Sequence, residues 1–259
     1  MLRLYTHAFS IVPWRVRIAL HEKGLDYETV VTDLHSKQPE PGFLALNPFA
    51  QIPVLDDEGF IVAESMAILE YLEEKHPEPA LMPSDLESRA TVRKWMCWGT
   101  DYWPPAWKKW MAPRLPGTSG DSSTPESVAE GRREICHHLD VLQRQLVGRE
   151  WLVNDYSLAD ICYAPFVLVL EHVELGEEIA RRPAVDPWVD RKEHEAWQEI
   201  VHFTDRYARQ LIRDQGMNNH LSWDFDHSYT RNAAMVAHSL MEEYEEHMRA
   251  QGAADPAAH

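Results

Sequence analysis

The first 34 residues alternate between strand and helix patterns, and this constrains the fold more than any other feature of the chain. Residues 2–7 alternate apolar and polar side chains, which predicts a short strand. Pro13 suits the first turn of a helix that runs to Lys23 and stops at Gly24. Residues 27–34 are rich in β-branched side chains and predict a second strand. Two strands joined through one helix within so short a span should lie parallel.

A hairpin and a second helix follow. Residues 53–57 and 60–64 read as strands on either side of a turn at Glu58-Gly59, so we expect them to pair antiparallel. Ser65 is placed to cap a helix over residues 66–76, whose apolar side chains share one face. The order β-α-β, then β-β-α, predicts a compact α/β domain over residues 1–76.

Proline marks a domain boundary after this unit. The stretch HPEPALMP contains three prolines, so residues 77–83 read as a linker. Residues 84–215 then show helical patterns throughout and predict an all-helical domain, in which Pro104-Pro105 should kink or interrupt a helix. Three capping signals support it: the box Ser84–Glu87 that opens a helix toward Met111, the pair Thr124-Pro125, and the box Ser157–Asp160 before a buried helix. Residues 216–259 form a C-terminal extension, with an amphipathic helix expected over residues 229–249.

Composition limits the possible partners. The formal net charge is −17, which argues against nucleic acid and anionic membrane surfaces, although a local basic pocket for a small anion remains open. We expect no secretory signal and no membrane span. The three cysteines are far apart in the sequence, which favours a reducing cytoplasm over a disulfide framework or a structural zinc site.

Four motifs occur in order over roughly residues 1–190. They are SIVPWRVRIAL from Ser10, NPFAQIPVL from Asn47, ESMAILEYL from Glu64 and YSLADI from Tyr156. Together they resemble the serine-type members of the glutathione transferase superfamily, particularly the zeta and tau classes and bacterial relatives. The resemblance implies an N-terminal thioredoxin-like domain followed by an all-helical domain, with glutathione as co-substrate and a homodimer as the assembly.

The chain departs from the family pattern in two places. Ala50 stands where the family usually has glycine, and a left-handed backbone there would be strained with alanine. Beyond about residue 190, the sequence has no counterpart that we can name.

Ser10 is the candidate catalytic residue, because glutathione chemistry needs a thiolate at neutral pH. A free thiol has a pKa of about 8.5, so little of it is ionised at pH 7. A hydrogen bond to the charged sulfur contributes about 1.5–3 kcal/mol, and a helix N-terminus adds about 0.3–1 kcal/mol. Their sum corresponds to a pKa drop of about 1.5–3 units. The resemblance gives this role to Ser10; on position alone, a helix cap is the better explanation of Ser10.

The resemblance also implies a glutathione site around two later segments. Pro53 would follow a cis bond, leaving the backbone of Ile52 to pair with the cysteinyl part of the ligand. At the start of the next helix, Ser65 would bind the γ-glutamyl carboxylate and Glu64 the ammonium group. The plainer interpretations are a proline that starts an edge strand and a serine that caps a helix. Gln51 is a further candidate contact, and Lys37 or His35 could meet the glycyl carboxylate.

Residues 93–111 contain five tryptophans and a tyrosine. Any single one of these rings belongs more often to a core than to a site. So many beside the expected cleft nevertheless predict an aromatic pocket between the domains for a hydrophobic electrophile. We expect Trp98, Tyr102 and Trp103 to line it, and Tyr102 could donate a hydrogen bond to a developing charge.

The tail carries a competing signal. His220, Asp224, Asp226 and His227 are possible metal ligands, but their spacing fits no zinc pattern, so we predict a polar loop and no metal. The sequence therefore predicts a transferase that uses glutathione for conjugation, or for displacement such as ether cleavage or dehalogenation. The alternative is a non-catalytic ligand-binding or interaction protein of the same fold.

Overall fold

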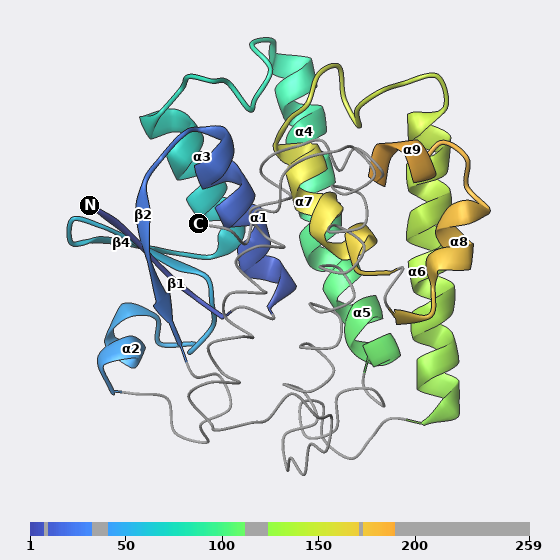
Figure 1. The fold of residues 1–259 in the computed structure, drawn as a ribbon, viewed down its shortest axis with the longest axis horizontal. Coiled ribbons are helices and arrows are strands. Elements are labelled where there is room, and N and C mark those ends of the chain that lie inside the picture. Colours follow the sequence, from blue (N-terminus) through green and yellow to red (C-terminus); the bar gives the residue numbers. More distant parts are fainter. Residues whose placement is uncertain (8–9, 33–40, 112–123, 171–172, 190–259) are drawn as a thin grey trace, which may run out of the picture.

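A computed structural model describes residues 1–7, 10–32, 41–111, 124–170 and 173–189. An α/β unit lies beside a bundle of helices, on the left and right of Figure 1. The α/β unit contains β1 (Leu2–Thr6), α1 (Ile11–Glu22), β2 (Tyr27–Val31), α2 (Pro41–Leu46), β3 (Val54–Asp57), β4 (Phe60–Ala63) and α3 (Ser65–Lys75). This order confirms the α/β pattern predicted for the N-terminal part of the chain.

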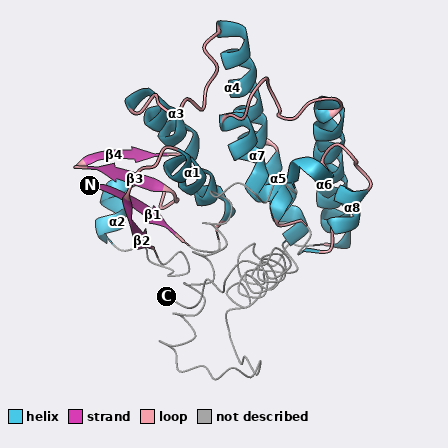
Figure 2. Ribbon diagram, turned by 45° about the horizontal axis from the view of Figure 1, so that its top comes forward, coloured by secondary structure: helices cyan, strands magenta, loops and turns pink. Residues whose placement is uncertain are grey.

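The four strands form one mixed sheet in the order β2-β1-β3-β4. β1 pairs parallel with β2, and the β3–β4 hairpin pairs antiparallel, both as predicted. In Figures 1 and 2, α1 and α3 lie together on one face of the sheet and α2 lies on the other. Apolar side chains of β1, β3, α1 and α3 fill the space under the two helices, among them Leu4, Leu20 and Leu55. The sheet and this core hold the starts of α1, β3 and α3.

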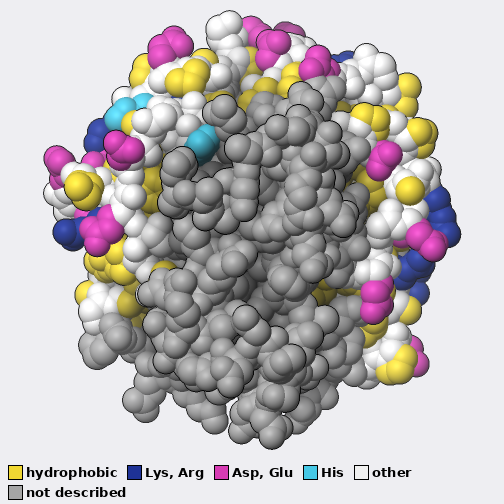
Figure 3. All heavy atoms as spheres, in the orientation of Figure 1, with side chains coloured by type: hydrophobic (Ala, Val, Ile, Leu, Met, Phe, Trp, Pro, Cys, Tyr) yellow, Lys and Arg dark blue, Asp and Glu magenta, His cyan; other side chains and the backbone are white. Residues whose placement is uncertain are grey.

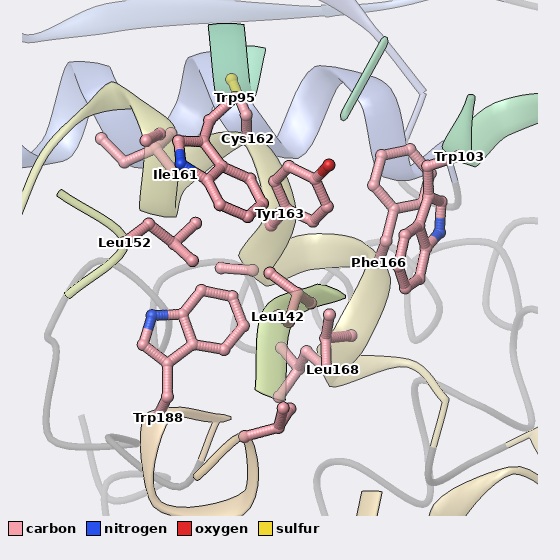
Figure 4. Packing of buried hydrophobic residues seen from close by; sticks show 14 of the residues in the cluster. Trp95, Trp103, Leu142, Leu152, Ile161, Cys162, Tyr163, Phe166, Leu168 and Trp188 are labelled. Carbon is pink, nitrogen blue, oxygen red and sulfur yellow. The ribbon is translucent and has the colours of Figure 1, made fainter. Parts of the chain in front are cut away.

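The remaining elements are all helices. They are α4 (Leu86–Asp101), α5 (Trp103–Met111), α6 (Pro125–Leu146), α7 (Leu158–Leu168), α8 (Gly176–Ala180) and α9 (Asp186–Val189). Every residue of α7 is buried, as predicted for a helix that is apolar on all sides. The rings of Trp95 and Trp103 pack against Tyr163 and Phe166 of this helix (Figure 4).

The capping box of Ser157 and Asp160 and the helix start at Thr124-Pro125 were predicted correctly, and two other caps were not. Thr124 and Ser127 cap α6 reciprocally, and Ser157 and Asp160 cap α7. α4, however, is capped by Asp85, whose carboxylate accepts from the Ser88 N–H at 2.8 Å, and not by Ser84. Ser65 is the first helical residue of α3, and Glu64 occupies the capping position.

The helix expected to open near Ser84 and run toward Met111 is two helices. α4 ends at Asp101, and α5 begins at Trp103 with Pro104 and Pro105 in its first turn, where a missing N–H is tolerated. This is the interruption that the proline pair predicted.

Around the edge of the face drawn in Figure 3, acidic, basic and apolar side chains are interspersed. Within the described part of the chain, no helix has the length and apolar content needed to cross a membrane. The amphipathic helix predicted over residues 229–249, the extension that contains it and the polar cluster from His220 to His227 lie outside the described residues.

Candidate functional site

Ser10 lies at the start of α1, where it was predicted. Its backbone is extended, with φ −92° and ψ 117°, and its N–H donates to the His7 carbonyl at 3.1 Å. Its side chain, however, makes no capping hydrogen bond to the first turn of the helix. Ser10 therefore occupies the capping position, but its hydroxyl does not cap the helix. The hydroxyl is available to a ligand at the positive end of the helix.

The loop before β3 is shaped by Asn47, a residue that sequence reasoning overlooked. Asn47 is buried; its side-chain amide donates to the Gln51 carbonyl at 2.8 Å and accepts from the Phe49 N–H at 3.1 Å. Ala50 has a φ of 52°, the left-handed backbone that was expected to strain an alanine. The bond between Ile52 and Pro53 is cis, as the resemblance implied. Gln51 is exposed beside it.

Glu64 and Ser65 form the start of α3. Glu64 has a φ of 71°, an uncommon conformation for a residue with a side chain, of the kind that clusters at binding sites. Ser65 is only 4% exposed. The starts of α1 and α3 thus both place serine beside free backbone N–H groups, an arrangement suited to binding anionic groups.

A pocket of about 570 Å³ lies among α4, α5, α6 and α7. Trp98 and Tyr102 line it, together with Asp101, Pro105, Arg133, Glu134, His137, His138, Val141 and Tyr163. These residues all belong to the helical part of the chain, whereas the sequence predicted a pocket between the domains.

The prediction for Trp103 needs correction. Its side chain is fully buried, with its ring centroid 5.0 Å from that of His138 and 5.7 Å from that of Phe166. It is therefore part of the core behind the pocket and does not line it.

Two polar groups of the pocket lining, His138 and Tyr163, are uncharged at pH 7. Burial lowers the pKa of His138 to about 4, against the opposing effect of a hydrogen bond to the Tyr102 backbone. Burial also raises the pKa of the Tyr163 phenol. The pocket therefore combines aromatic walls and two uncharged hydrogen-bonding groups with the acidic or basic side chains of Asp101, Arg133 and Glu134.

Arg15 connects α1 to the helical bundle, and nothing in the sequence marked it. Its guanidinium is fully buried and donates to the carbonyls of Gly99 at 2.7 Å and Cys162 at 2.9 Å. Cys162 also approaches α3, since its thiol lies 3.7 Å from the Met66 sulfur. The helices that begin at Ser10 and Ser65 thus both rest against α7.

Lys37 and His35 lie outside the described residues. Among those that are described, no three His, Cys, Asp or Glu side chains come together as a metal site would require.

The chain belongs to the glutathione S-transferase family. Residues 1–74 match the family profile of the glutathione S-transferase N-terminal domain, and residues 105–196 match that of the C-terminal domain. Members of this family bind glutathione as a substrate.

Individual relatives agree with the family profiles. Glutathione S-transferase F10 of Arabidopsis thaliana is 32% identical over 207 residues, which cover 77% of this chain and 96% of the relative. Maleylacetoacetate isomerase of Rattus norvegicus is 32% identical over 175 residues, or 66% of this chain and 79% of the relative. The crystal structure of a Methylobacterium radiotolerans glutathione S-transferase, in complex with glutathione sulfonate, is 28% identical with a TM-score of 0.63, covering 74% of this chain and 90% of that one.

Proposed function

We propose that the chain is a serine-type glutathione transferase whose thiolate attacks a small hydrophobic electrophile. The observation that carries the proposal is the Ser10 hydroxyl, which lies at the start of α1 and does not cap it. Such a hydroxyl can donate to the sulfur of bound glutathione. Together with the helix dipole it would lower the thiol pKa by about 1.5–3 units.

The rest of glutathione would be held by the two neighbouring segments. The Ile52 backbone before cis Pro53 pairs with the cysteinyl group, with Gln51 beside it. Ser65 and the first N–H groups of α3 bind the γ-glutamyl carboxylate, and Glu64 binds the ammonium group. Lys37 is proposed for the glycyl carboxylate from its sequence position alone.

The electrophile should be apolar and aromatic. Trp98 and Tyr102 remain the proposed contacts, supported by their place in the lining of the 570 Å³ pocket. The thiolate forms a carbon–sulfur bond; in a displacement the leaving group departs with its electron pair, and in an epoxide opening the oxygen takes up a proton. We propose that this reaction serves detoxification or catabolism. Assays with glutathione and a panel of aryl ethers, epoxides and aryl or alkyl halides would distinguish conjugation from displacement.

A second candidate reaction is the isomerisation of maleylacetoacetate. It is favoured by the rat relative of that name, which is 32% identical over 175 residues. Maleylacetoacetate assayed beside the electrophile panel tests it, and absence of turnover excludes it.

A non-catalytic ligand-binding or interaction protein is the competing proposal. Ser10 favours an enzyme, because a scaffold does not need a thiol-activating hydroxyl. Binding of glutathione followed by titration of its thiol separates the two, with Ser10→Thr as the control that keeps a hydroxyl. If glutathione does not bind, the transferase proposal is wrong.

We also propose that the protein is a cytoplasmic homodimer. The described cysteines are all unpaired, which suits a reducing compartment. Phe49, on the loop before β3, is 76% exposed and offers an apolar group for a second subunit to cover. Sedimentation velocity measures the assembly, and a monomer at micromolar concentration would contradict the dimer.

A further inference from the structure

Arg15 carries a positive charge in the interior of the protein. The side chain is 0% exposed, and its third polar contact is with the Thr100 hydroxyl, at 3.3 Å. The guanidinium also lies over the Phe166 ring, 4.8 Å from the centroid. Among the described residues, no Asp or Glu forms an ion pair with it. Buried charges are usually paired with an opposite charge, so this one needs an explanation.

The groups that face Arg15 do not neutralise it. α7 contributes the Cys162 thiol, whose pKa burial raises to about 12, and Tyr163, whose phenol pKa burial also raises, so both are uncharged at pH 7. α4 contributes Thr100 and the Gly99 carbonyl. Gly99 lies in the last turn of α4, where the helix dipole supplies about half of one negative charge. A net positive charge therefore remains inside the protein.

The position of this charge relates it to the candidate site. Ser10 immediately precedes α1 and Arg15 lies five residues further along, a separation of about 7.5 Å along a helix axis. A sulfur held by Ser10 would lie on the order of 10 Å from the guanidinium. Because the charge is buried, mobile ions screen it far less than they would screen a surface lysine.

This inference rests on the proposed function of Ser10. We propose that Arg15 stabilises the thiolate of glutathione bound beside Ser10, through its unpaired buried charge. Arg15 does not touch the sulfur and is not a catalytic residue; its field acts through the protein. At about 10 Å and an effective dielectric constant of about 20, one charge shifts a thiol pKa by about 1 unit. The end of α4 offsets up to half of this, which leaves about 0.5–1 unit.

The test is a titration of glutathione bound to the full chain, followed by the ultraviolet absorbance of the thiolate. Arg15→Met removes the charge and should raise the thiol pKa by about 0.5–1 unit. Arg15→Lys keeps the charge and should titrate like the wild type. The turnover rate of Arg15→Met should fall at neutral pH and recover at alkaline pH, where the thiol ionises without help. A purely structural role would not give this recovery.

A second pair of variants leaves Arg15 in place, in case Arg15→Met does not fold. Thr100→Asp puts a carboxylate next to the guanidinium and should raise the thiol pKa by a similar amount. Thr100→Asn introduces an uncharged side chain of nearly the same size as aspartate and should leave the thiol pKa unchanged. The proposal is overturned if Arg15→Met or Thr100→Asp titrates like the wild type, or if Arg15→Lys shifts the pKa as far as Arg15→Met does.

Ser10→Ala in the same series separates this inference from the function on which it rests. If Ser10→Ala raises the thiol pKa and neither charge variant does, only the role of Arg15 is wrong. If the wild type does not lower the thiol pKa at all, the proposed function is wrong, and the role proposed for Arg15 is wrong as well.

Discussion

Replacement of Gly131 by alanine should push two helices apart. Gly131 lies on α6 where it meets α5, and an added Cβ would lie 2.7 Å from the Lys109 Cβ, 2.7 Å from the Trp110 backbone nitrogen and 2.9 Å from the Ala106 carbonyl oxygen. Two of these three atoms belong to the backbone, so rotation of a flexible side chain cannot relieve the contact. The helices themselves must separate.

The expected cost follows from two opposing effects. Overpacking a core costs about 1–3 kcal/mol, while alanine gains about 1 kcal/mol over glycine inside a helix. Because the contact is with backbone, we expect the upper part of the first range and a net loss of about 1–2 kcal/mol in the free energy of unfolding. In a protein of this size that lowers Tm by about 2–8 °C.

Urea unfolding and thermal scans measure this change. Gly42→Ala is the matched control, since Gly42 lies in α2 and an added Cβ there meets nothing within 4 Å. It should leave stability unchanged or raise it by up to about 1 kcal/mol. The reasoning is refuted if Gly131→Ala is as stable as the wild type, because the α5–α6 contact would then tolerate a methyl group.

Two further perturbations test the buried charges. The side chain of Lys23 is fully buried, and its ammonium lies 2.7 Å from the Glu73 carboxylate. Lys23→Met leaves that carboxylate without its cation and should lower the free energy of unfolding by about 3–5 kcal/mol. In urea unfolding, adding Glu73→Gln should restore part of this loss, and a loss below about 1 kcal/mol for Lys23→Met alone would contradict the prediction. Burial raises the pKa of Asp160 from 3.8 to about 6, so its protonated form is the one that folding favours. The stability of the wild type should therefore fall relative to Asp160→Asn as pH rises from about 4 to about 6, by up to about 3 kcal/mol. Unfolding both proteins across this range tests the sign, and an opposite slope would show that the hydrogen bonds to Asp160 outweigh its burial.

The sequence was sufficient to predict those elements that depend on residues close together in the chain. The parallel β1–β2 pair, the hairpin turn at Glu58-Gly59 and the capping box of Ser157 and Asp160 all follow from residue spacing, and the structure confirms them. The proline pair after Trp103 likewise predicted the break between α4 and α5.

Tertiary packing decided the rest. Spacing alone could not show that Asp85 caps α4 in place of its neighbour Ser84. Nor could it show the positive φ of Glu64 or the burial of Trp103, whose ring contacts lie on α6 and α7. Nothing in the sequence predicted the burial of Arg15, because its partners lie on α4 and α7, far along the chain.

The candidate site was predicted from its resemblance to a family rather than from residue chemistry alone. The structure adds that Ser10 does not cap its helix and that the bond before Pro53 is cis. The contacts of Gln51, Glu64 and Ser65 with glutathione remain predictions.

The central claim is that Ser10 makes bound glutathione a thiolate at neutral pH, and titration of the bound thiol tests it most directly. In the wild type, the thiol pKa should lie about 1.5–3 units below the ordinary value of about 8.5. Ser10→Ala should raise the thiol pKa most of the way back to the ordinary value, and Ser10→Thr should leave it near that of the wild type. A Ser10→Ala protein that binds glutathione and titrates like the wild type would contradict the account.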